Sequence, residues 1–469
     1  MIRKKTLPEQ NEFWVTRDSI RAGRGKTFYD RLADDLDKEG FGDFVRELCA
    51  PYYHAEAGGR PPIDPEVYFK MLMVGYFEKL PSERGIASRC EDSLSVRRFL
   101  RCDVTEATPD HSSLSIIRNR LPAEVYAEVF TFSLRPLRRA GLLPGKKIGI
   151  DSTTMEANAS LGKLERREDG KSYGDYVAEL AAAEGIDPED KAAVAEFDRK
   201  RKGKKTSNEE WVSPNDPAAS IGPRKDGAWD MIHKVENAVD LDSGAILSCE
   251  IQSATKADST GMAAHIETAA AVVDHIADQV DEPTETPTDP DADHDDEAIE
   301  EDEEDAASQK RYGVGDKGYH KNAELAELVA GGIEPVIAEP AGRAPSKNNE
   351  EQAKAFETNR TNRKTDMGRE LMRARAEKVE RSFQHQLDHG GARRTTLTGH
   401  ENIGKRLMIS AFTFNLAIYG RNVYGFGTVK QYQAGNRWVG PLFALVRAAW
   451  RFFSNPRRLL GAKSRIFPV

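Results

Sequence analysis

The sequence predicts an α/β protein in which an all-helical segment precedes a mixed sheet with helices on its faces. Successive short helical patterns occupy residues 61–140. Residues 147–151 and 313–316 each read as a short apolar strand that ends in an aspartate. A long helical pattern over residues 365–387 follows the second strand, after another helix and strand. This alternation of strands and helices is typical of a sheet covered by helices.

The N-terminal 140 residues are expected to form a helical domain. Pro65 suits a first helical turn, and Ser82 is a good N-cap for a second helix. Helices are expected at residues 67–80, 93–100 and 122–140, and two more are expected to begin near Ser82 and Thr108. Arg97 and Arg98 are among the arginines expected on exposed helix faces. Such helices suit DNA binding, and a plain helical bundle with solvated arginines is an equally good interpretation.

A polar insertion is expected at residues 160–215, after the first strand. It contains two helical patterns, residues 176–184 and 188–201, and the basic run 199–205. That run suits either contact with DNA or a solvated helix end.

The second half of the chain is expected to continue the sheet. The turn Asp242-Ser243-Gly244 separates two apolar runs and predicts a hairpin. The remaining elements are expected as strands at 228–240, 244–253 and 334–337, helices at 261–280, 322–330, 365–387 and 401–419, and a loop at 340–362.

Charge is segregated along the chain, although the net charge is −9. Residues 281–305 hold 15 Asp or Glu and no Lys or Arg, so the remainder has a net charge of +6. Residues 281–310 are expected to be a disordered acidic linker. Residues 421–469 carry nine Lys or Arg and no acid. This basic tail suits contact with phosphate, and a merely solvated segment is the alternative.

Composition excludes several classes of protein. No apolar run approaches the roughly 20 residues of a membrane span, and the N-terminus does not resemble a secretory signal. The four cysteines lie far apart, which favours reduced core thiols over a zinc site. We therefore expect a cytoplasmic protein.

Three carboxylates suggest a phosphoryl-transfer site. Asp151 and Asp316 each end a predicted strand, and Glu380 lies in the long basic helix. Two such strands can be neighbours in the sheet, with the helix laid across its edge, as in the ribonuclease-H-like fold. Carboxylate oxygens suit two Mg²⁺ ions about 3.5–4 Å apart, which can activate a nucleophile and stabilise a leaving oxygen. A carboxylate that merely caps a turn is the simpler alternative for each aspartate.

At these residues the chain resembles the DDE transposases of bacterial insertion sequences. Two of the motifs are Asp-Lys-Gly-Tyr from Asp316 and Val-Glu-Arg-Ser-Phe around Glu380. The segments that carry the resemblance are residues 149–153, 208–217, 225–227, 233–240, 315–320, 379–383, 391–395 and 399–402. Residues 59–121 resemble the N-terminal domain of these transposases.

The resemblance implies that Asp151, Asp316 and Glu380 bind two Mg²⁺ ions, for which Mn²⁺ substitutes. It implies nicking at transposon ends, followed by attack of the freed 3′-hydroxyl on target DNA. The implied partners are terminal inverted repeats, target DNA and a second copy of the chain, because two ends must be joined. The domains would be 1–140 for DNA binding, 141–420 for catalysis and 421–469 as a tail.

The chain departs from the family around the glutamate. Many relatives place a tyrosine seven residues before it, an arginine four before it and a lysine seven after it, where this chain has Arg373, Ala376 and Leu387. Arg373 and Arg375 are then candidates for the basic contact. Glu377 competes with Glu380 as the third carboxylate, because it lies three residues away on the helix. Glu380 is preferred because it stands in the matching motif.

Other side chains are candidates for contact with nucleic acid. Phosphate contacts are expected from residues near the three carboxylates: Lys317, His320, Arg373, Arg381, Arg393 and Arg394. A surface role for Lys317 and His320 is equally open. His233 and Glu236 suit either support of the site or ordinary core packing. The aromatic residues of the tail, Trp438, Trp450, Phe452 and Phe453, suit packing or stacking on bases.

Two alternatives to a transposase remain. One is a host-adopted nuclease of the same fold that cuts DNA without joining it. The other is a DNA-binding protein with a vestigial site.

Overall fold

The computed structural model describes residues 27–53, 62–202, 207–224, 226–281 and 310–434. Nearly all of the expected acidic linker, part of the basic run 199–205 and most of the basic tail, with its four aromatic residues, lie outside these ranges.

A mixed sheet forms the centre of the molecule. Strand β5 pairs antiparallel with β1 on one edge, and with β6 and β4 on the other. Beyond β1 follow β7 and β8, both parallel to it. The order is therefore β6-β5-β1-β7-β8, with β4 extending the first edge. The strands are β1 Lys147–Glu156, β4 Ser220–Pro223, β5 Trp229–Asp240, β6 Ile246–Gln252, β7 Arg311–Gly315 and β8 Ile333–Ile337.

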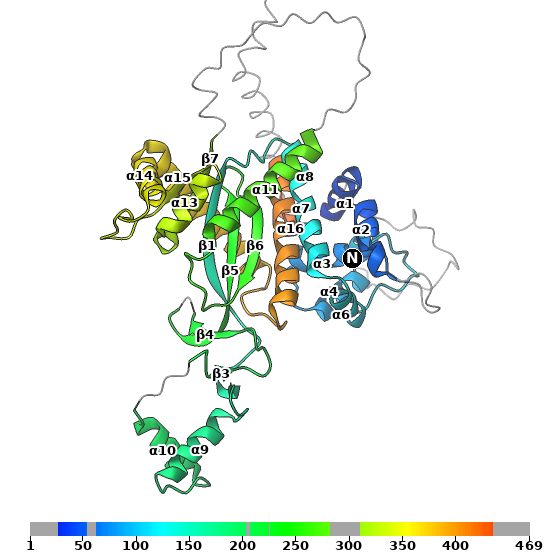
Figure 1. Cartoon of the computed structure of the whole chain (residues 1–469). Coiled ribbons are helices and arrows are strands. Elements are labelled where there is room, and N and C mark those ends of the chain that lie inside the picture. Colours follow the sequence, from blue (N-terminus) through cyan, green and yellow to red (C-terminus); the bar gives the residue numbers. More distant parts are fainter. Residues whose placement is uncertain (1–26, 54–61, 203–206, 225, 282–309, 435–469) are drawn as a thin grey trace, which may run out of the picture.

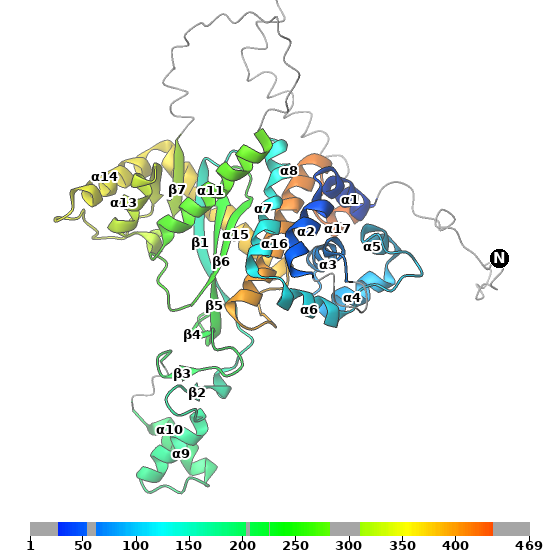
Figure 2. The same ribbon diagram turned by 45° about the vertical axis from the view of Figure 1, so that its right-hand side comes forward.

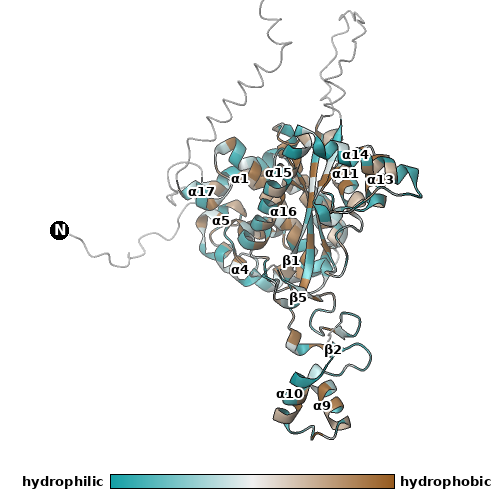
Figure 3. Ribbon diagram, turned by 90° about the vertical axis from the view of Figure 1, so that its left-hand side faces the viewer, coloured by the Kyte–Doolittle hydropathy of each residue, from teal (hydrophilic) through white to brown (hydrophobic). Residues whose placement is uncertain are grey.

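Helices cover both faces of this sheet. Helix α11 (Met262–Asp281) packs on one face, where Ile266 lies against Gly313 of β7. Helix α15 (Asp366–Phe383) crosses the other face, where Arg375 lies against Gly149 of β1. Helices α13 (Asn322–Ala330) and α14 (Glu350–Lys364) pack around β8. Hydrophobic and hydrophilic residues alternate along the helices, as expected for helices with one buried face (Figure 3).

In the described ranges, eight α-helices precede the sheet. They are α1 Phe28–Lys38, α2 Phe41–Cys49, α3 Pro65–Phe77, α4 Glu83–Asp92, α5 Leu94–Phe99, α6 His111–Arg120, α7 Ala123–Phe132 and α8 Leu134–Arg139. The expected caps are present, since Ser82 accepts a hydrogen bond from the Gly85 amide.

Helix α16 (His400–Tyr424) joins these helices to the sheet. It lies between them and β6 (Figures 1 and 2). Asn415 hydrogen-bonds the amide and carbonyl of Ile246 in β6, and also the hydroxyl of Ser133 at the α7–α8 junction. One continuous hydrophobic core therefore runs from the N-terminal helices through α16 into the sheet.

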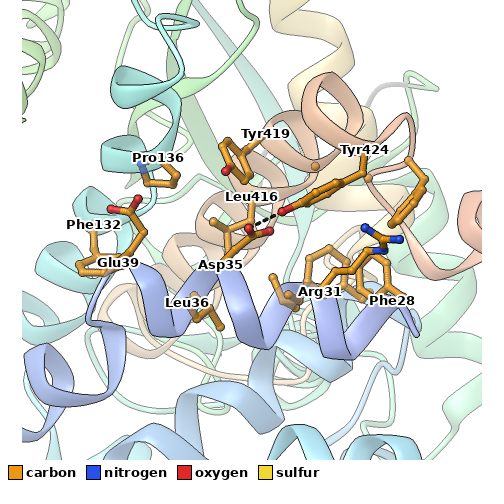
Figure 4. Close-up of a pocket in the computed structure, with 15 residues that line it drawn as sticks. Phe28, Arg31, Asp35, Leu36, Glu39, Phe132, Pro136, Leu416, Tyr419 and Tyr424 are labelled. Carbon is orange, nitrogen blue, oxygen red and sulfur yellow. Dashed lines mark hydrogen bonds between the residues drawn. The ribbon is translucent and has the colours of Figure 1, made fainter. Parts of the chain in front are cut away.

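The last turns of α16 also pack on α1 (Figure 4). Tyr424 donates a hydrogen bond to Asp35 at 2.5 Å, and the Arg31 guanidinium lies 5.3 Å from the Tyr424 ring centre. The cavity left between them measures about 30 Å³, so the two helices are closely packed. A short helix, α17 (Val429–Gln433), follows.

The expected insertion projects from the end of the sheet (Figures 1 and 2). It contains α9 (Tyr173–Ala183), α10 (Lys191–Lys200) and the two-residue strands β2 (Glu165–Arg166) and β3 (Trp211–Val212). A small hydrophobic cluster that is separate from the main core joins Leu164 and Trp211 of the insertion to Ile221 of β4 and Met231 of β5.

Most expected elements are confirmed, and two expectations are wrong. The predicted loop 340–362 contains α14, because Asn349 caps a charged helix whose buried Phe356 packs inward. The strand of Asp151 continues to Glu156, so Asp151 lies mid-strand rather than at the end, because β5 pairs with β1 along its whole length. Helix α15 ends at Phe383 and continues as a π-helical turn, Gln384–His389. Within the described ranges, we find no helix with the length and apolar character of a membrane span.

Candidate active site

Strand register brings Asp151 and Asp316 to the same level. In the parallel pair β1–β7, Gly149 lies opposite Val314, so two residues further along each strand come the two aspartates. Strand β7 ends at Gly315, and Asp316 caps the short 3₁₀ helix η4 (Lys317–Tyr319) by accepting a hydrogen bond from the Gly318 amide at 2.8 Å. Asp316 therefore stands at a strand end, as the sequence predicts.

Arg375 of α15 joins the two aspartates. Its Nη2 atom lies 2.7 Å from Asp151 Oδ2 and 4.0 Å from Asp316 Oδ2, and its Nε donates to the Ile150 carbonyl. The residue is only 8% exposed. Its stem reaches this position because Gly149 has no side chain, and a Cβ there would lie 3.3 Å from Arg375 Cγ.

A third aspartate, Asp258, lies beside this pair. It belongs to the loop between β6 and α11, and its Oδ1 accepts a hydrogen bond from Ser152 Oγ at 2.8 Å. Its other oxygen faces Gly318, next to Asp316. Burial raises the pKa of Asp151 to about 6; Arg375 opposes this shift, and the charges of Asp316 and Asp258 add to it. The site thus gathers carboxylates whose negative charges repel.

These residues fit a divalent cation. The donors are carboxylate oxygens, which hard cations such as Mg²⁺ prefer. The guanidinium of Arg375 already lies between Asp151 and Asp316 and balances part of their negative charge. A cation bound to their remaining oxygens would further favour the ionised form of Asp151, whose pKa burial raises.

The structure does not bring the three predicted carboxylates into one compact group. Glu380 lies five residues beyond Arg375 on α15, with an exposed side chain, and its competitor Glu377 is also exposed and pairs with Arg381. Among the described residues, the ligand atoms of three or more acidic, His or Cys side chains come within 4.8 Å of one another only at Glu236, Glu250 and His265.

That group belongs to a buried polar network behind Asp316. Tyr319 donates to Glu236 at 2.8 Å, and Glu236 also contacts His265 Nδ1 at 2.8 Å. The other nitrogen of His265 contacts Ser248 Oγ, so both ring nitrogens are already in use. Burial raises the pKa of Tyr319 above its usual range. The network ties the Asp316 turn to β5, β6 and α11.

The predicted phosphate contacts differ in exposure and in their partners. Lys317 and Arg373 are exposed, Arg381 and Arg393 are paired with Glu377 and Asp388, and the backbone of Arg394 bridges to β1. His320 is only 2% exposed, with its ring against Phe356, so the expected surface position is wrong.

The two N-terminal arginines also differ from each other. Arg97 is 7% exposed and donates to the carbonyls of Asp103, Val104 and Glu106, so the prediction of an exposed Arg97 is wrong. These carbonyls belong to the loop after α5, and the buried Arg97 guanidinium supplies their hydrogen-bond donor. Arg98 pairs with Asp30.

Of the expected core residues, His233 contacts Asp216 at 2.9 Å and is fully buried. Sequence reasoning missed Asp258. The available signal was an acidic residue shortly after a predicted strand, the same signal that marks Asp316.

Comparison with protein families finds a similarity in the N-terminal part of the chain. Residues 18–120 match the model of a protein family described as "Transposase domain (DUF772)". Comparisons with curated proteins and with solved structures found no significant match. The matched segment includes most of the N-terminal helices, α1 to α6. The similarity to a transposase domain thus concerns the N-terminal helical part of the chain.

Proposed function

We propose that the protein is a DDE-type DNA transposase that nicks at transposon ends and joins the freed 3′ ends to target DNA. The observation that carries this proposal is the pairing of Asp151 and Asp316, on adjacent parallel strands, around one buried cationic group. The match to a transposase domain supports the same class of reaction.

The sheet supports a ribonuclease-H-like catalytic domain. Numbered along the chain without β4, its main strands have the order 3-2-1-4-5, and only the second strand runs antiparallel to the others. The strands numbered 1 and 4 are β1, which contains Asp151, and β7, which Asp316 directly follows.

Asp151 and Asp316 would hold divalent cations, with Glu380 as the proposed third carboxylate. The chemistry that two such ions supply when bound is activation of an attacking oxygen and stabilisation of a leaving oxygen at phosphorus. Asp151 must be ionised for this role, and its neighbours Ser152 and Arg375 favour the ionised form. Glu380 is proposed because it lies on the helix that delivers Arg375 to the site.

The proposed partners are DNA and a second copy of the chain. Two transposon ends must meet for joining, so we expect a dimer in the complex with end DNA. Light scattering of that complex tests this, and a strictly monomeric complex would contradict it. Exposed Lys317 and Arg373 are the proposed phosphate contacts near the site.

The experiment is cleavage of DNA that carries the gene's own flanking ends, with Mg²⁺ or Mn²⁺. We expect end-specific nicking by the native protein and at least a 100-fold loss in D151N, D316N and E380Q. The matched control is E377Q, which removes a nearby exposed glutamate of α15 and should retain activity.

Each other outcome has a distinct meaning. Loss in E377Q with activity in E380Q would move the third carboxylate to Glu377. Nicking without strand joining would favour a nuclease. End-specific binding without cleavage by any variant would favour a DNA-binding protein with a vestigial site.

A further inference from the structure

The π-helical turn that continues α15 meets the ends of two other helices at one surface. His385 lies against Phe414 of α16, with ring centres 4.9 Å apart, and its ring centre is 4.7 Å from that of His389. Directly after the turn, a Cβ at Gly390 would lie 3.2 Å from the Tyr76 ring near the end of α3. The ends of α3 and α16 therefore border the π-helical turn.

Three cations reach this surface from the bordering segments. Lys79 follows α3, Arg421 lies two turns beyond Phe414 on α16 and so shares its helix face, and Lys430 belongs to α17. Lys79 and Lys430 are exposed, whereas Arg421 is half-buried. None of the three forms an ion pair with another residue of the described ranges. The Nε atom of Arg421 is buried and has no hydrogen-bond partner there. The surface thus offers positive charge and an unused donor, which suit an anion.

The neighbouring acids do not supply that anion. Glu377 already pairs with Arg381 at 2.6 Å, and Asp388 with Arg393 at 2.8 Å. The positive charges of Lys79, Arg421 and Lys430 are therefore left without a counter-charge.

These positive charges also lie close enough to repel one another. Burial, and then the charge of Arg381, lowers the pKa of Arg421. Burial, and then the charge of Lys79, lowers the pKa of His389, and the charge of Lys430 acts in the same direction. Cations from α3, α15, α16 and α17 thus converge on the π-helical turn, where a bound anion would reduce their repulsion.

The backbone of Lys79 gives independent support. Its φ of 59° lies in the left-handed region, at a position after a helix that glycine usually occupies. The Leu80 amide closes this turn by donating to the Gly75 carbonyl at 2.7 Å. A glycine would strain this turn less than a lysine, so the strain favours a function for the lysine side chain.

We propose that Lys79, Arg421 and Lys430 form a binding surface for the phosphate backbone of the DNA substrate, beside the proposed active site. The inference rests on the proposed function, because it names the surface that holds the same DNA. His389 lies 14 residues beyond Arg375, which is about 20 Å along the helix, or roughly six base pairs of duplex. One duplex can therefore contact this surface and the candidate active site. The surface also gives a role to the described beginning of the basic tail, residues 421–434.

Fluorescence anisotropy of a labelled duplex carrying the gene's own flanking end tests this proposal. The full-length protein is titrated without metal, at several salt concentrations. We expect K79Q/R421Q/K430Q to lower the affinity by at least about tenfold. The slope of log affinity against log salt should fall by about 2–3, because each neutralised phosphate contributes about 0.9.

A charge-matched control is K347Q/K354Q/K364Q. These exposed lysines lie on or just before α14, which packs around β8 at the other edge of the sheet. The control should bind the duplex within about twofold of the native protein. An equal loss in both triple variants would trace the effect to net charge and overturn the proposed surface.

The single variant K79G separates binding from stability. It should keep or raise the melting temperature, because glycine relieves the left-handed turn, and it should still lower DNA affinity by about two- to fivefold. K79G carries the test if the triple variant does not fold.

The outcomes distinguish this inference from the proposed function. Native affinity and salt slope in K79Q/R421Q/K430Q, together with end-specific nicking by the native protein, would overturn the surface and leave the proposed function standing. A native protein that binds no DNA at low salt would overturn both.

Discussion

Asp240 is a fully buried carboxylate at the end of β5, next to the turn that leads to β6. Burial raises its pKa to about 6 from the ordinary 3.8, and hydrogen bonds from Ser243 oppose part of this shift. A raised pKa means that the folded state binds the proton more tightly. The contribution of Asp240 to the free energy of unfolding is therefore greatest at acidic pH and is lost as the pH rises through 6.

The neutral variant D240N removes this titration. We expect its unfolding free energy, relative to the native protein, to improve by about 1–3 kcal/mol between pH 4 and pH 7.5. Urea unfolding at the two pH values measures the change. The exposed neighbour Asp242 gives the control D242N, and a difference for D240N that does not vary with pH would contradict the prediction.

The contact between β1 and α15 depends on the absence of a side chain at Gly149. A Cβ there would lie 2.5 Å from Leu241 Cδ2 and 3.3 Å from Arg375 Cγ. We expect G149A to lower the unfolding free energy by about 1–3 kcal/mol, because the helix and the turn must move apart. G162A, with only Ser160 Oγ at 3.8 Å, should change stability by less than about 0.5 kcal/mol. Equal effects would refute the packing argument.

The projecting element that contains α9 and α10 depends on Trp211. The indole is buried against Tyr173 and Tyr176, with ring centres 5.4 and 5.6 Å apart. We expect W211A to expose residues 160–210 to limited proteolysis while the main melting transition stays within a few degrees, because this cluster is separate from the main core. Trp229 is exposed, so W229A is the control. A native-like digestion pattern in W211A would argue against a separate folding unit.

The N-terminal helices and the sheet are expected to unfold together in one step, because α16 shares its core with both of them. N415A leaves the Ile246 amide and carbonyl without their partner and should cost about 2–4 kcal/mol. Helix content and aromatic fluorescence should report one shifted transition. N422A on the same helix, which loses only a bond to the Ile418 carbonyl, should cost less than about 1 kcal/mol. Two separate transitions would show that the helices and the sheet unfold independently.

Local patterns alone determined most elements of this protein. Ser82 and Pro65 mark real helix starts, and Asp242-Ser243-Gly244 marks a real hairpin, because caps and tight turns depend on neighbouring residues only. The same patterns placed Asp151 and Asp316 on strands that turn out to be neighbours. The predicted loop at 340–362 failed because α14 is stabilised by packing on β8, which the sequence does not display.

Tertiary structure decided the rest of the site. Strand register puts Asp151 level with Asp316, although β1 continues five residues beyond Asp151. Helix orientation turns Arg375 inward and leaves Glu380 exposed, since residues five apart on a helix face different directions. Asp258 joins the group only because the loop that holds it folds against β1 and the Asp316 turn. Residue types and local patterns can be read from the sequence. Distances between side chains that are far apart in sequence are fixed only when the sheet and helices pack together.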